Sequence, residues 1–379
     1  MPFQRNEPDE VREPDEILTP SGRAQRPHDQ TDALRRFLLS LYERQPRASL
    51  TRGLIAINVA VFAVMVFTGA DPLRPGVDDL RTWGASYGPA FVGGEWWRAL
   101  TAPFIHAGIV HLLLNMWILH QVGQLTERLY GRVDFALVYL AAGISGVAAS
   151  TTWNPVITSV GASGAIFGLI GAEYIALRLH GPDIPPLLRR ETGRRLLIFL
   201  GLNLFLGMTM PMIDNAAHIG GFCGGIVAGA LLLGGRPTLG SEHRTRLRAA
   251  VVALAAIIVL SIPHLLPADL DRHTTTMAET VERLRSLDER YRALASRYNA
   301  DELAAQRAAA LLETELIPEL EAVLAQLERS DPPSPLLARR RERLQALARE
   351  LLEDMRHAHE LTGAGPPADA DGPDTTGDD

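Results

Sequence analysis

The sequence predicts an all-α, polytopic membrane protein that carries a helical extension. Three observations lead to this fold class. Between about Leu54 and Leu266 the apolar residues form blocks of roughly 17 to 22, the length of a helix that crosses a bilayer. The remainder of the 379-residue chain is strongly charged. Beyond residue 280, apolar residues recur at the three- and four-residue spacing of packed helices.

Composition excludes some classes of protein. The formal net charge of −7 is carried by the two ends of the chain, so it gives no indication of nucleic-acid binding. Cys223 is the only cysteine, which excludes an intramolecular disulfide framework. No apolar core follows the first seven residues, so no cleavable signal peptide is expected.

The first 48 residues are expected to form a cytoplasmic and mostly disordered tail. Residues 1 to about 30 are rich in Pro, Asp, Glu and Arg and cannot bury a core. Residues 32–44 then carry apolar side chains at helical spacing, which predicts a short amphipathic helix. This helix either lies on the membrane surface or packs on the protein's own cytoplasmic loops.

Six membrane helices are expected within a core over residues 49–235, and a seventh follows it. The six lie at about 52–69, 103–126, 134–151, 163–180, 195–210 and 216–234. The apolar run over 250–266 predicts the seventh, although it is short and Pro263 lies near its end. The segment between the first two helices contains several tryptophans, which favour the membrane interface. We therefore expect this segment to be a partly embedded loop.

Arginine placement predicts the orientation of these helices. Arginines precede the first helix and lie in the connections 2–3, 4–5 and 6–7, whereas the connections 3–4 and 5–6 carry none. The long first loop is an exception, with Arg74, Arg81 and Arg98. By the positive-inside rule the N-terminus is cytoplasmic, and Ser163 and His218 then begin helices on the external side.

A helical or coiled-coil module is expected over residues 269–362, outside the cytoplasm if the seventh helix spans. Its first apolar residues have the spacing of a coiled-coil seam: Leu284, Leu287, Tyr291, Leu294 and Tyr298. Pro318 is expected to kink or restart the helix, and the Pro-rich break at 330–335 precedes a further helix. The module is a helical hairpin, a coiled coil that forms oligomers, or a solvated spacer. Residues 363–379 are expected to be an acidic, disordered tail.

Two polar residues at the starts of apolar helices are the candidate catalytic residues. Ser163 opens the fourth helix and His218 lies at the start of the sixth. A buried hydroxyl needs a partner, and a serine and a histidine on facing helices form a nucleophile and its base. The string Gly-x-Ser-Gly alone is weak evidence, because small residues also let membrane helices pack closely.

Small residues continue at four-residue spacing after both candidates. They are Gly164, Gly168 and Ala172 on one helix and Gly221, Gly225 and Gly229 on the other. His218 shares the face of Gly221 and Gly225. Two such stripes allow a short distance between backbones, which a Ser–His hydrogen bond requires. The packing interpretation and the catalytic interpretation therefore support each other.

A histidine and an asparagine on the second helix are candidates for stabilising an oxyanion. His111 and Asn115 are four residues apart and share one face. Polar groups in membrane helices are costly and often functional, so we expect them to act together with the amide of Ser163. A metal site is the rival interpretation, but His106, His111 and His120 share no face and no His-Glu-x-x-His motif is present. We expect no metal and no cofactor.

The remaining polar and aromatic candidates are expected to be structural. Trp97 and Arg98 would anchor the long loop at the interface, and His106 would hold that loop by a hydrogen bond. Glu127 ends the second helix on the cytoplasmic side, where it is expected either to cap or to pair with neighbouring loops, with an interfacial ion pair as the preferred interpretation. Phe167, one turn after Ser163, would pack on the imidazole of His218. Asn154 and Asp214 lie in external loops, and neither is assigned a role.

Together these residues resemble the rhomboid family of intramembrane serine proteases. The resemblance covers about residues 52–235 and rests on Trp97-Arg98, His106, His111-x-x-x-Asn115, Gly161-Ala162-Ser163-Gly164 and Ala217-His218-x-x-Gly221-x-x-x-Gly225. It implies that Ser163 is the nucleophile and His218 the base of a dyad with no acidic third member. It also implies that His111, Asn115 and the Ser163 amide form the oxyanion hole.

The resemblance has two further implications for individual residues. Glu127 matches a glutamate that stabilises the long first loop in the family. Phe167 is a departure, because many members have tyrosine at this position, so the aromatic stack remains without the hydroxyl. The N-terminal tail and the C-terminal helices are not covered.

The expected function is therefore an intramembrane serine endopeptidase that cleaves single-pass membrane proteins near the external membrane boundary. One alternative is a rhomboid-like pseudoenzyme that binds transmembrane clients without cutting, although such proteins usually lack the serine or the histidine. Another is a transporter, which should show internal repeats or interrupted helices. The expected partners are transmembrane substrates and the bilayer, with no nucleic acid and with homo-oligomers through the C-terminal helices as an open alternative. The expected location is the bacterial inner (cell) membrane, as a multi-pass protein.

Overall fold

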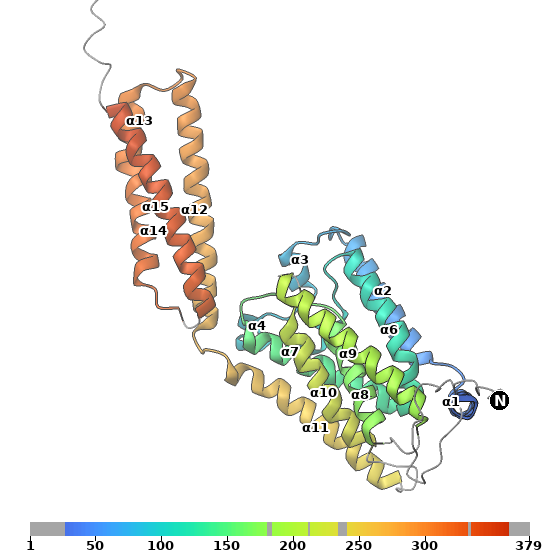
Figure 1. The fold of residues 1–379 in the computed structure, drawn as a ribbon. Helices are drawn as coiled ribbons and strands as arrows, with labels where there is room; N and C mark the ends of the chain where they lie inside the picture. The colour runs from blue at the N-terminus through green and yellow to red at the C-terminus, as the bar shows by residue number, and fades with distance from the viewer. Residues whose placement is uncertain (1–26, 180–183, 211–212, 234–240, 333–334, 364–379) are drawn as a thin grey trace, which may run out of the picture. The chain divides into compact units, whose positions relative to one another are not determined.

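The computed structural model describes residues 27–179, 184–210, 213–233, 241–332 and 335–363. These residues are almost entirely helical (Figure 1), and a single antiparallel bridge between Ser86 and Ser159 is their one pairing of extended backbone. The predicted all-α class is confirmed. The tails expected to be disordered lie mostly outside the described residues. The chain forms two compact units, residues 1–87 with 95–262 and residues 88–94 with 263–379.

The first unit contains the apolar helices. In chain order its elements are α1 (Pro27–Arg44), α2 (Ser49–Phe67), α3 (Val77–Thr82), α5 (Arg98–Thr101), the 3₁₀ turn η1 (Ala102–Phe104), α6 (Ile109–Tyr130), α7 (Arg132–Trp153), α8 (Ser163–Leu179), α9 (Pro186–Thr209), α10 (Asn215–Leu233) and most of α11 (Ser241–Leu265). The short α4 (Gly88–Val92) is grouped with the second unit.

Several of these helices are long and apolar enough to cross a membrane. They are α2, α7, α10 and α11, and α6 joins them when it is taken with the short segment before it. That segment, residues 98–104, is bent by 93° from α6. Helix α8 has 17 residues and is nearly all buried, and α9 begins with a charged half. Apolar length in the described residues thus supports a polytopic membrane protein.

Three helix starts differ from those predicted. Helix α6 begins at 109 rather than 103, because Pro103 lies in a 3₁₀ turn and Gly108 adopts φ +108°. Helices α9 and α11 begin at 186 and 241 rather than at 195 and 250. Both extensions are charged, so an apolar pattern alone places the start of each helix too late.

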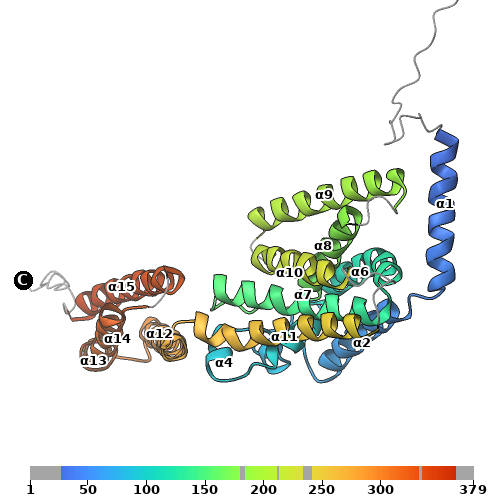
Figure 2. The same cartoon turned by 90° about the horizontal axis from the view of Figure 1, so that it is seen from below.

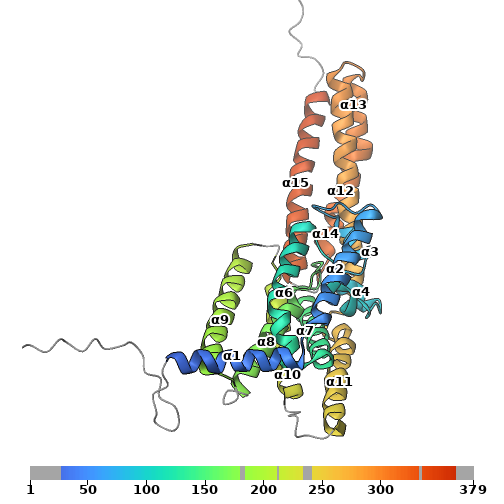
Figure 3. The same cartoon turned by 90° about the vertical axis from the view of Figure 1, so that its right-hand side faces the viewer.

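Helix α8 is the central helix of the first unit. Its residues from Gly164 to Glu173 are all buried, and it packs against α6, α7 and α10 (Figures 2 and 3). Ala165, Ile166, Leu169 and Ala172 belong to the main apolar core. The buried carboxylate of Glu173 accepts a hydrogen bond of 2.8 Å from the Thr126 hydroxyl of α6.

An ion pair joins α11 to the rest of the first unit. Nε of Arg248 donates to Oδ1 of Asp134 at the start of α7, at 2.6 Å. One turn further along α11, Val251 is buried in the main core. The seventh predicted helix is therefore packed on the membrane helices, as Figure 2 shows for α11 beside α7.

The second unit is a bundle of three helical arms. Its arms are α12 (Leu270–Asn299), a middle arm of α13 (Ala305–Leu311), a π-helical turn (Leu312–Leu316) and α14 (Ile317–Arg329), and α15 (Pro335–Gly363) (Figures 1 and 3). Residues from all three arms are fully buried in one core, including Leu287, Leu320, Val323, Ala348 and Met355. The three seam leucines of α12 are therefore covered within the same chain, whereas Tyr298 at the end of the seam is exposed.

The helix accommodates Pro318 by a π-helical turn shortly before it. Proline has no N–H and clashes with the carbonyl four residues earlier in a regular helix. Here a π-helical turn over Leu312–Leu316 precedes Pro318, and the helix then continues as α14. The middle arm therefore passes the proline without ending.

We predict that Arg248→Ala destabilises the protein by about 1–3 kcal/mol, between the cost of breaking a buried pair and that of breaking a surface pair. The Asp134 side chain is 9% exposed and would lose its cation, while Arg248 is 31% exposed. Thermal or denaturant unfolding in detergent measures the change. The control is Arg246→Ala in the same helix, whose pair with Glu242 is exposed. Equal effects of the two substitutions would contradict the prediction.

Candidate active site

Ser163 is the first residue of the central helix, directly after a sharp turn. The turn is made by Gly161, which has φ +114° and donates its N–H to the Ala102 carbonyl at 3.0 Å. A side chain at position 161 would also meet His111, because an added Cβ would lie 2.9 Å from Nε2 of that ring. Glycine is therefore required here, and the imidazole of His111 lies against the turn that leads to Ser163.

His218 lies one turn into α10 and is packed on an aromatic ring. Its imidazole is parallel to the ring of Phe167, with centroids 4.1 Å apart and planes at 7°. The residue is 6% exposed. Nδ1 of the ring is buried, and within the described residues it has no hydrogen-bond partner. The stack expected between these two side chains is present, and it fixes the plane of the imidazole.

The backbones that carry Ser163 and His218 are in direct contact. An added Cβ on Gly164, the residue after Ser163, would lie 3.3 Å from the carbonyl oxygen of Ala217, the residue before His218. One turn along α10, a Cβ on Gly221 would overlap the carbonyl oxygen of Gly164. The two stripes of small residues thus face each other. No hydrogen bond joins the two side chains in the described structure, and catalytic hydrogen bonds often tighten only when substrate binds.

The two candidate oxyanion donors are held differently. Nδ1 of His111 accepts the backbone N–H of Ala107 at 3.3 Å. In a neutral imidazole the proton is then on Nε2, the nitrogen that lies against Gly161. Asn115 instead donates its amide to the His111 carbonyl at 2.9 Å. His111 is thus ready to donate toward the Ser163 turn, whereas Asn115 is engaged by its own helix.

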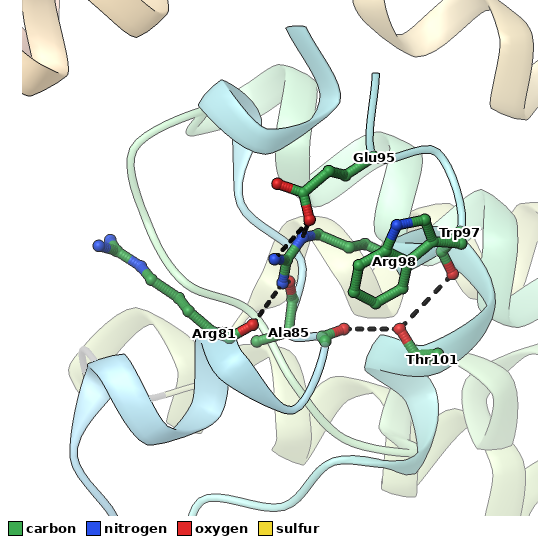
Figure 4. Close-up of polar contacts among 7 residues, drawn as sticks. Arg81, Ala85, Glu95, Trp97, Arg98 and Thr101 are labelled. Atoms are coloured by element: carbon green, nitrogen blue, oxygen red, sulfur yellow. Dashed lines mark hydrogen bonds and ion pairs between the residues drawn. The ribbon is translucent and has the colours of Figure 1, made fainter. Parts of the chain in front are cut away.

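The long loop before α6 is folded around Arg98 (Figure 4). Its guanidinium donates to the carbonyl oxygens of Arg81 and Ala85, at 2.6 and 3.0 Å, and pairs with Glu95 at 2.7 Å. Trp97 covers the guanidinium at 4.6 Å from the ring centroid. One arginine therefore closes the backbone turn between α3 and α4.

Known proteins match this chain in sequence over the part that carries the candidate site. The family model of the rhomboid domain matches residues 93–235. RHOMBOID-like protein 6, mitochondrial, from Arabidopsis thaliana is 32% identical over 220 residues, which are 50% of this chain and 71% of that protein. The putative rhomboid protease YdcA from Bacillus subtilis (strain 168) is 34% identical over 142 residues, 37% of this chain and 69% of that protein. This chain belongs to the rhomboid family.

Other relatives match over a smaller share of their length. Rhomboid protease GluP from Bacillus subtilis (strain 168) is 38% identical over 205 residues, 54% of this chain and 38% of that protein. RHOMBOID-like protein 7 from Arabidopsis thaliana is matched over 54% of its length. The chain thus spans about half or less of these two relatives. The match to the rhomboid family model contains every candidate site residue, and α11 and the three arms of the second unit lie outside it.

Glu127 of this rhomboid caps the start of a neighbouring helix. Its fully buried carboxylate accepts the backbone N–H groups of Leu50 and Thr51, the Thr51 hydroxyl and the Gln45 amide. These contacts hold the start of α2 and the turn before it. Among the described residues Glu127 forms no ion pair, and no hydrogen bond joins it to the long loop. Of the two expected roles, the structure has the cap and not the ion pair, because the first turn of α2 offers free N–H groups that the carboxylate can accept.

Asp214 is the residue that sequence reasoning missed. Its carboxylate accepts the hydroxyls of Ser150 and Ser159, the latter at 2.6 Å, and the N–H of Ala217 at 2.9 Å. An aspartate three residues before a helix N–H is a usual N-cap signal, so the capping contact could have been found. The two serine contacts join distant segments and have no sequence signal.

We predict that Gly221→Ala lowers the free energy of unfolding by about 1–3 kcal/mol, because its methyl group overlaps the backbone of α8. The matched control is Gly201→Ala in α9, where an added Cβ has no neighbour within 4 Å. There the substitution should be neutral or slightly stabilising, since alanine favours helix. Unfolding in detergent measures both variants. A stable Gly221→Ala protein would contradict the close α8–α10 contact.

Proposed function

We propose that this rhomboid is an intramembrane serine endopeptidase with Ser163 as nucleophile and His218 as base. The observation that carries the proposal is the contact of Gly164 with Ala217. It brings the residue after the serine against the residue before the histidine. Ser163 Oγ would attack the scissile carbonyl while His218 takes its proton, and His218 would then protonate the leaving amine. Water would hydrolyse the acyl-enzyme by the same route in reverse.

The oxyanion of the tetrahedral intermediate would be stabilised from two sides. Nε2–H of His111 lies against the Ser163 turn. The backbone N–H of Ser163 is at the first position of α8, where no helical carbonyl is available to accept it. Asn115 would add a third donor after leaving the His111 carbonyl. Preorganised donors of this kind are typically the largest single contribution to acyl-transfer catalysis.

The substrates we propose are single-pass membrane proteins cut near the external boundary. Ser163 begins a membrane helix, so it reaches only bonds near one end of a span. The arginine distribution supports an N-terminus in the cytoplasm and a site on the external side. A peptide bond inside an intact helix is shielded, so the substrate segment must unwind before attack.

Ser163→Ala and His218→Ala should each reduce cleavage of a transmembrane reporter to background, because nucleophile and base act as one unit. Asn115→Ala should reduce the rate by on the order of 10²–10³ at most, as for one oxyanion donor. The assay uses purified protein in detergent. Ser261→Ala in α11 is the control, because that hydroxyl bonds only the Ile257 carbonyl of its own helix. Substantial proteolysis by Ser163→Ala would overturn the assignment, and a wild-type protein that binds the reporter without cutting it would favour the pseudoenzyme.

Product termini should map to the external end of the substrate helix, next to small residues such as alanine. Gly or Pro near that end should increase cleavage, because weak helix formers lose less on unwinding. Mass spectrometry of the products locates the cuts, and a metal chelator should leave the rate unchanged. Cuts at the centre or the cytoplasmic end of the helix, or inhibition by the chelator, would contradict the proposed geometry.

A further inference from the structure

One carboxylate joins the two segments that lead to the proposed nucleophile and base. Asp214 lies in the turn before α10, and its Oδ1 caps that helix through the N–H of Ala217 at 2.9 Å. Oδ2 accepts two hydroxyls, one from Ser150 near the end of α7 and one from Ser159 in the loop before α8. The side chain therefore contacts α7, the loop before α8 and α10 at once.

The loop before α8, which Asp214 contacts through Ser159, also forms hydrogen bonds with the long first loop. The backbones of Ser159 and Ser86 exchange two hydrogen bonds of 3.0 Å. The Ser86 hydroxyl bonds that of Thr151 at 2.8 Å, and Arg81 donates to the Thr158 hydroxyl at 3.0 Å. The loop before α8 thus lies between the long first loop and Asp214. It is a strip of fixed backbone that ends at the Ser163 turn.

Asp214 and its partner Ser159 each lie close in the chain to one of the two proposed reacting residues. Ser159 is four residues before Ser163, and Asp214 is four residues before His218. The backbone N–H of His218 itself donates to the Asp214 carbonyl at 3.1 Å. A shift of Asp214 relative to Ser159 would therefore move the two proposed reacting side chains relative to each other. Misplacement of about 1 Å is enough to cost on the order of 10²-fold in rate.

We propose that Asp214 is a positioning residue that sets the distance between Ser163 and His218. The inference rests on the proposed protease function. Asp214 acts through the backbone and is not a third member of a triad, because both of its oxygens are occupied by the two serine hydroxyls and the Ala217 N–H. Its carboxylate form is essential, since an amide in its place offers one oxygen for three donors.

The test is Asp214→Asn in the full-length protein in detergent, with two readouts. Cleavage of a transmembrane reporter should show kcat reduced by about 10- to 100-fold with KM within about twofold of wild type. Labelling by a small fluorophosphonate, which needs Ser163 and His218 but no transmembrane substrate, should slow by a similar factor. Asp71→Asn is the control, because that carboxylate lies in an exposed loop and accepts only local N–H groups.

A second variant separates positioning from folding. Ser159→Ala removes one hydroxyl and should lower kcat in the same direction by a smaller factor, with an unchanged thermal midpoint. Asp214→Asn combined with Ser159→Ala should be no slower than Asp214→Asn alone, because both act through one contact. Additive losses, a change in KM alone, or unchanged labelling would overturn the proposal. If Asp214→Asn does not fold, an unchanged kcat for Ser159→Ala overturns it.

The same experiment distinguishes this inference from the function on which it rests. If wild-type protein cleaves the reporter and is labelled at Ser163, the protease function stands whatever Asp214→Asn does. If wild-type protein does neither, the protease function fails and the positioning role fails with it.

Discussion

The backbones of α8 and α10 are in contact at Gly221, which has no side chain to separate it from the Gly164 carbonyl, and this contact brings the segments that carry Ser163 and His218 together. Lipid tails are as apolar as leucine, so burying larger apolar side chains would give membrane helices little reason to associate. Close packing of small residues provides van der Waals contact instead. The same glycines that stabilise the bundle thus bring the candidate residues together.

The polar parts of the site depend on this packed interior but lie at its edge. The turn at Gly161 places Ser163 at the end of α8, and the loop folded by Arg98 lies beside it in the same unit. The loop backbone outside the helices has carbonyls that need donors, and one guanidinium supplies several at once. The hydrogen-bonded loop therefore fixes the groups next to the Ser163 hydroxyl, and Ser163 itself stays half-buried.

Much of the fold could be predicted because membrane helices have a strong sequence signal. Apolar length located the helices, and the four-residue spacing of glycines identified the facing stripes of α8 and α10. Helix starts were less accurate where a charged extension or a 3₁₀ turn precedes the apolar run. For the second unit the heptad spacing of α12 was real, but the same spacing suits a partner helix in the same chain or in another.

The candidate site was predictable as a set of residue types, and its contacts were not. Ser163, His218 and Phe167 stand at spacings that indicate facing helices, and the Phe167–His218 stack follows from them. The partners of Glu127 are 76, 77 and 82 residues away in the chain, and those of Asp214 include residues 64 and 55 away. No local pattern encodes such a pairing, because it depends on which helix ends meet in three dimensions.

These long-range carboxylate contacts have a common form. Glu127 joins α6 to the start of α2, Asp134 joins α7 to α11, and Asp214 joins α10 to α7 and the loop before α8. Each lies near a helix end, where free N–H groups or an arginine can satisfy a charge that the apolar interior could not. Apolar faces allow a helix to slide or rotate at small cost, whereas a carboxylate with two or three fixed donors does not. In this unit the small residues therefore determine how closely the helices approach, and the carboxylates at their ends determine the register.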